Sequence, residues 1–76
     1  APVGIAFSRS LKERPDLVLY KHDGHPTRHG TYLAACVFYA TFLQRSPIGN
    51  TYSDGVISAE ERDFLQRIAA ETVKIW

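Results

Sequence analysis

The stretch that decides the fold is residues 23–45, DGHPTRHGTYLAACVFYATFLQR, in which a polar loop leads directly into an apolar segment. Between Tyr32 and Leu43 only Thr41 is polar. A helix that is apolar on every side lies in a core or in a membrane, because none of its faces suits water. This segment is too short for a bilayer, which takes about 20 residues to cross. We therefore expect a core helix with neighbours on several sides.

The other residues of this 76-residue chain offer few such neighbours. A chain of roughly 60 residues buries only about 60% of the surface that it exposes when unfolded. Cys36 is the single cysteine, so no disulfide within the chain strengthens a small core. We expect residues 1–76 to be the C-terminal segment of one larger domain, whose N-terminal part is the partner that covers the helix.

The charges of the chain are nearly balanced. Nine basic and eight acidic residues give a net charge of +1, and they are scattered along the sequence. The sequence therefore contains no concentrated positive charge that would attract nucleic acid or an anionic membrane, so we expect neither partner. The position of Cys36 inside the apolar segment favours a role as a small core residue over a role as a nucleophile.

A short amphipathic helix is expected near the start of the chain and should end at Arg14, because a proline follows. Its buried face would carry Val3, Ala6, Phe7, Ser10 and Leu11. Residues 17–20, LVLY, form a short apolar run typical of a buried strand or of a packed extended segment. A lone strand needs a partner, which is a second indication that part of the domain lies outside these residues.

The loop before the apolar helix has its own local signals. Pro26 disfavours a helical backbone at His25, and Thr27 is a suitable N-cap for the helix. Gly30 lowers helix propensity in the first turn, so we expect another backbone segment to pass close to it.

The last helix should begin after Ser58, which forms a capping box with Glu61, and should run from Ala59 nearly to the end of the chain. Its apolar face carries Phe64, Leu65, Ile68, Thr72, Ile75 and Trp76. Its solvent face carries Arg62, Asp63, Gln66, Arg67, Glu71 and Lys74, with Asp63–Arg67 and Arg67–Glu71 at ion-pair spacing.

Asp23 and His25 are the candidate catalytic residues. A neutral imidazole can take a proton from a hydroxyl nucleophile when a carboxylate holds its other nitrogen and stabilises the cation that forms. A separation of two residues lets one loop pair them. By residue type alone, such a pair is more often a turn aspartate beside a solvated histidine, so that interpretation stays open beside the catalytic one.

Two metal sites are conceivable, and we expect neither. His22, His25 and His29 fall within eight residues, but a proline interrupts them and no fourth zinc ligand lies nearby. Residues 50–61 match an EF-hand calcium loop at several positions, yet Tyr52 stands where a liganding carboxylate belongs. A turn that leads into the capped helix explains the same residues, and no cofactor is expected.

The pattern DGHPTxxGTYLAACVFYA, followed by SP and by FLQxIA in the last helix, resembles the C-terminal end of SGNH (GDSL-type) serine hydrolases. In that superfamily an Asp stands a few residues ahead of a His-Pro-Ser or His-Pro-Thr that opens the final helices. The likeness covers nearly the whole chain and is most specific over residues 19–47. It implies an α/β fold of the flavodoxin-like, three-layer α/β/α type, to which these residues contribute about three helices.

The resemblance also implies that His25 is the general base and that Asp23 orients it. The nucleophilic Ser, in a Gly-Asp-Ser-like block, and the oxyanion-hole donors would come from an earlier part of such a protein. The substrate would be a small-molecule or carbohydrate ester. Family members usually have Asp-x-x-His, whereas here His22 stands three residues before His25. Either Asp23 still reaches the histidine across a shorter loop, or the acid contributes less.

Two other functions stay open. The apolar helix would serve equally well in a small helical interaction module, although this leaves the loop at residues 23–30 unexplained. A catalytically inactive SGNH-like binding domain would fit the altered spacing. Thermal unfolding of the isolated chain distinguishes an interaction module from a fragment of a larger hydrolase domain. A module unfolds cooperatively, whereas a fragment is molten or aggregated.

Overall fold

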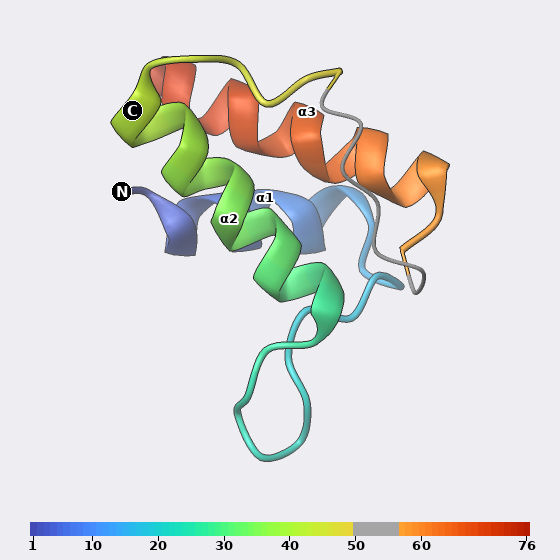
Figure 1. Cartoon of the computed structure of the whole chain (residues 1–76). Coiled ribbons are helices and arrows are strands. Elements are labelled where there is room, and N and C mark those ends of the chain that lie inside the picture. Colours follow the sequence, from blue (N-terminus) through green and yellow to red (C-terminus); the bar gives the residue numbers. More distant parts are fainter. Residues whose placement is uncertain (50–56) are drawn as a thin grey trace.

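In the computed structural model, which describes residues 1–49 and 57–76, three helices pack against one another (Figure 1). Figure 1 shows the middle helix crossing obliquely over the other two, and the loop that precedes it projecting away from the helices. The helices are α1 (Val3–Glu13), α2 (Arg28–Leu43) and α3 (Ala59–Ile75).

The expectation of a mainly helical segment with about three helices is confirmed. The described residues contain no β-strand beyond one isolated antiparallel bridge between Tyr20 and Pro26. The sheet of the expected α/β fold therefore has no counterpart in this part of the chain. None of the described helices combines the length and the apolar character that crossing a membrane requires.

α1 buries most of the face that its sequence predicts. Ala6, Phe7 and Ser10 are buried, whereas Leu11, at the edge of that face, is exposed. The backbone N–H of Arg14 donates to the carbonyl oxygen of Ser10 at 2.8 Å and closes the last turn. The helix thus ends where the following proline predicts.

Residues 17–20 take the second of their two expected forms, a packed extended segment. Leu17 and Leu19 are buried in the core, and Val18 and Tyr20, which alternate with them, are exposed. This period of two is typical of an extended backbone with one covered face. The opposite face of the segment is open to solvent.

α2 is covered on one face only. Its buried face packs against α1 and α3, and Leu33 and Val37 at its centre are fully buried. On the other face Phe38 and Phe42 are 45% and 69% exposed, and their rings stack with centroids 5.7 Å apart. Two helices cannot surround a third, so the neighbours expected on several sides are only partly supplied by the described residues.

α3 begins as predicted and buries Leu65, Ile68 and Thr72. Ser58 and Glu61 form the capping box, with both backbone-to-side-chain hydrogen bonds present at 3.0 and 3.1 Å. The assignment of Ile75 and Trp76 to the buried face is wrong, because both side chains are largely exposed.

The prediction that Gln66 faces solvent is also wrong. Its side chain is 1% exposed and is hydrogen-bonded inside the molecule. The amide nitrogen donates to the Tyr32 hydroxyl at 2.9 Å, and the amide oxygen accepts from the backbone of Gly49 at 3.1 Å. Burial is tolerated here because both ends of the amide find partners.

The ion pairs along α3 are partly as expected. Arg67 pairs with Glu71 at 3.3 Å, which confirms one of the two predicted contacts. Asp63 pairs with its neighbour Arg62 instead of Arg67. Arg67 reaches Glu13 of α1 at 2.9 Å, an interaction that spacing within one helix cannot reveal. These pairs are exposed, so each contributes little to stability.

Gly30 lies against the backbone of Leu19, as expected from its place in the first turn of α2. A Cβ at position 30 would overlap the Leu19 carbonyl oxygen. The extended segment and α2 can approach this closely only because residue 30 has no side chain.

Replacing Gly30 with alanine should therefore destabilise the fold by about 1–3 kcal/mol, because a backbone atom would have to move to make room. Gly4→Ala in α1 is the matched control. A Cβ there meets nothing, so this change should be neutral or stabilising by up to about 1 kcal/mol. Urea unfolding followed by circular dichroism measures both variants, and equal stabilities would contradict the close approach at Gly30.

Candidate functional site

The candidate site is the loop between the extended segment and α2, which closes on itself as a small hairpin. The Lys21 N–H donates to the His25 carbonyl at 2.7 Å, and the Gly24 N–H donates to the Lys21 carbonyl at 3.0 Å. Gly24 has a φ of +86°, which favours glycine in this turn. The backbone thus brings residues 23 and 25 to the same turn.

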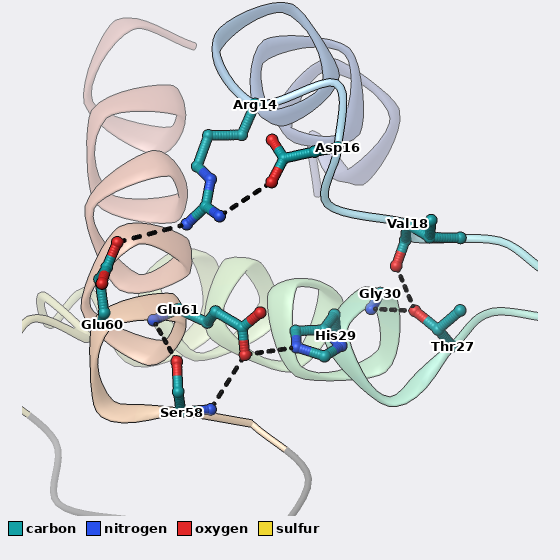
Figure 2. Close-up of polar contacts among 9 residues, drawn as sticks. All are labelled: Arg14, Asp16, Val18, Thr27, His29, Gly30, Ser58, Glu60 and Glu61. Atoms are coloured by element: carbon teal, nitrogen blue, oxygen red, sulfur yellow. Dashed lines mark hydrogen bonds and ion pairs between the residues drawn. The ribbon is translucent and has the colours of Figure 1, made fainter.

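Thr27 fixes the end of this loop to the start of α2. Its hydroxyl donates to the Val18 carbonyl at 2.8 Å and accepts the Gly30 N–H at 3.1 Å (Figure 2). Its backbone N–H donates to the Leu19 carbonyl at 2.9 Å. The predicted N-cap is confirmed, and the same side chain joins the helix to the extended segment.

Asp23 holds His25 at two points. One carboxylate oxygen accepts the backbone N–H of His25 at 3.0 Å, and the other lies 3.1 Å from the ring nitrogen Nδ1. A separation of two residues is therefore short enough for the acid to reach the imidazole. The side chains are 78% and 63% exposed for His25 and Asp23, so the pair faces solvent.

The other ring nitrogen of His25 is available. A carboxylate at Nδ1 favours the neutral tautomer with its proton on Nδ1, which leaves a lone pair on Nε2. Within the described residues no hydrogen bond reaches Nε2, and no described serine bonds to His25. The arrangement can therefore orient the ring and accept a proton from a group brought to Nε2.

His22 and His25 in the loop and His29 in the first turn of α2 do not gather into a cluster that could hold a metal ion. Among residues 1–49 and 57–76, no three His, Cys, Asp or Glu side chains gather closely enough to hold an ion. The loop considered for calcium falls largely on residues 50–56, which lie outside the described residues.

His29 has a different partner, which sequence reasoning missed. Its Nε2 lies 2.9 Å from Glu61, and the two side chains are only 16% and 26% exposed (Figure 2). The contact ties the first turn of α2 to the first turn of α3. The hydrogen bond from His29, together with that from the Ser58 backbone, lowers the pKa of Glu61 from 4.5 to about 2. No local signal predicts this pair, because the capping box already accounts for Glu61.

Cys36 is buried on the inner face of α2, as predicted. Burial raises the pKa of its thiol to about 11. Since the thiolate is the reactive form, this shift and the burial of Cys36 both disfavour a role as nucleophile at neutral pH.

A pocket of about 440 Å³ lies beside the loop. It is lined by Val18, Tyr20, Lys21, His22 and Thr27. The pocket therefore combines an apolar side from the extended segment with polar groups that flank the Asp23–His25 turn. Sequence reasoning did not select Tyr20 or Lys21 as site residues, because neither the end of a short apolar run nor the first residue of a polar loop has a distinguishing pattern.

No family model, no curated protein and no solved structure matches this chain. The likeness to SGNH hydrolases therefore stays a prediction from the sequence.

The contact with Asp23 should hold His25 in the tautomer with its proton on Nδ1. Long-range ¹⁵N–¹H NMR spectra at a pH where the ring is neutral distinguish the two tautomers. Asp23→Ala should remove the preference, because the acceptor at Nδ1 is lost. His22, which has no hydrogen-bond partner among the described residues, is the internal reference. An unchanged tautomer ratio in the variant would show that Asp23 does not hold the ring.

Glu61 should make the free energy of unfolding depend on pH in the acidic range. Its folded pKa of about 2 lies below the ordinary 4.5, so the unfolded state takes up the proton first. The stabilisation is complete above about pH 4.5 and is lost as the pH falls towards 2. Glu61→Gln should be less stable at neutral pH and should show a shallower loss of stability over that range.

The neighbouring Glu60→Gln is the control for this experiment, because the Glu60 side chain is almost fully exposed. It should keep the wild-type dependence of unfolding free energy on pH. If both variants keep that dependence in urea unfolding, Glu61 is not the group responsible.

Proposed function

We propose that this chain is the C-terminal segment of an SGNH-type serine hydrolase that acts on esters, with His25 as general base and Asp23 as its orienting partner. The observation that carries the proposal is the two-point contact of Asp23 with the backbone and Nδ1 of His25, which leaves Nε2 without a partner in the described residues.

The chemistry follows from the two ring nitrogens. Asp23 accepts a hydrogen bond from Nδ1–H, which keeps the ring in one tautomer and stabilises the imidazolium that forms during reaction. Nε2 takes the proton of a serine hydroxyl as the oxygen attacks the ester carbonyl, and it then gives this proton to the leaving alcohol. In the second half of the reaction, Nε2 takes a proton from a water molecule, which attacks the acyl-enzyme and releases the acid and the serine. The serine and the oxyanion-hole donors would be supplied by residues outside 1–76.

Surfaces outside the loop support a larger α/β/α domain. Residues 17–20 form an extended segment with Val18 and Tyr20 exposed, which suits pairing or packing with a neighbouring strand. The stacked rings of Phe38 and Phe42 leave the outer face of α2 apolar. In the proposed domain the N-terminal part covers both surfaces. The ester would be a small-molecule or carbohydrate ester, selected by loops of that part.

The outer face of α2 also favours a second candidate function, a helical interaction module. Phe38 and Phe42 lie one helical turn apart and present adjacent rings, an arrangement that suits a groove on a partner protein. Under this alternative the Asp23–His25 pair is only a turn structure, so its replacement would not affect the activity of the module.

The isolated 76-residue chain should not hydrolyse a generic aryl acetate at millimolar concentration faster than free imidazole does, because the nucleophile is absent. Burst kinetics from this chain would contradict the proposal. In a longer polypeptide that carries the serine, His25→Ala should lower kcat by about 10²- to 10⁴-fold. Asp23→Asn should also lower kcat strongly, since the tautomer changes. Lys12→Ala, on the exposed surface of α1 and away from the loop, is the control and should keep kcat within a few-fold.

A further inference from the structure

Another pocket, of about 450 Å³, lies between the C-terminal ends of α2 and α3. Figure 1 shows these ends together on the side of the molecule away from the candidate loop. The volume falls within the range of about 300–1,000 Å³ that is typical of small-ligand sites. The apolar wall of the pocket is made of Ala40, Ala70, Val73 and Trp76.

Two cations stand beside this apolar wall. Arg45 and Lys74 line the pocket, and no acidic residue does. Neither has a carboxylate partner among the described residues. Four other arginines of the described chain do pair with carboxylates: Arg9, Arg14, Arg62 and Arg67. The two side-chain cations therefore favour a ligand that is anionic at one end and apolar at the other.

We propose that this pocket binds a free carboxylate that carries an apolar tail. The tail lies against the apolar wall, where Trp76 offers the largest surface. The carboxylate meets Arg45, whose planar guanidinium can donate two parallel hydrogen bonds, and Lys74 adds a second positive charge. Thr41 also lines the pocket, but its hydroxyl oxygen is itself buried, so the polar contacts of the carboxylate come from the two cations.

A simpler role for the two cations makes a different prediction. Arg45 follows the end of α2 and Lys74 lies in the last turn of α3, where positive charges interact favourably with unpaired carbonyl groups. If this is their only role, their removal changes the unfolding temperature and leaves ligand binding unaffected.

Trp76 makes the test specific, because it is the single tryptophan of the chain and lines the pocket. Under conditions in which the 76-residue chain unfolds cooperatively, so that the pocket is formed, titration with octanoate should give a saturable change in tryptophan emission. Octanol has the same tail without the charge, octyltrimethylammonium has the opposite charge, and acetate has the charge without the tail. Each should need at least about tenfold higher concentration than octanoate for the same change.

Variants of the protein distinguish the contribution of the ligand's carboxylate to binding from that of its alkyl tail. The double change Arg45→Gln with Lys74→Gln should weaken octanoate binding by about tenfold and leave octanol binding unchanged. Ala70→Leu should fill the apolar wall and weaken both ligands. Lys12→Gln, on the exposed surface of α1, is the matched control and should behave as the wild type.

Three results would overturn the proposal. These are the absence of a saturable response to octanoate, equal affinities for octanoate and octanol, and unchanged octanoate binding in the double variant. None of these measurements involves ester hydrolysis, so their outcome does not depend on the role of His25.

Discussion

The close approach of the Leu19 backbone to Gly30 is the constraint on which the rest of this structure depends. It lets the Thr27 hydroxyl join the Val18 carbonyl to the first turn of α2, so the extended segment, the loop and the helix start are held together at one point. The hairpin that presents Asp23 and His25 grows from this junction. A side chain at position 30 would push the segments apart and move the base of the loop.

Two polar contacts between α2 and α3 fix the position of one helix relative to the other. Gln66 and Tyr32 share a buried hydrogen bond, and His29 contacts Glu61 closer to the first turns of the same two helices. Both contacts join residues more than thirty positions apart. Both contacts lie on the face of α2 that packs against α3, so the stacked phenylalanines on the opposite face remain at the surface. For this reason both proposed functions include something that covers that face, either a larger domain or a partner protein.

The two candidate sites occupy opposite ends of α2 and use different chemistry. At the N-terminal end an exposed acid and imidazole form a pair whose free nitrogen can move a proton. At the C-terminal end unpaired cations border an apolar pocket. The first was predictable from the sequence because its residues are two apart in one loop. The second was not, since its wall combines residues from two helices that meet only in the folded chain.

By itself the sequence determined the features that depend on near neighbours. The helix ends, the Thr27 cap, the Ser58–Glu61 capping box and the glycine at the close approach all follow from interactions within a few residues, and their signals are therefore local. The tertiary structure alone decided that Gln66 is buried, that Arg67 reaches Glu13, and that His29 meets Glu61. These choices depend on which helix faces which, and no spacing along one helix contains that information.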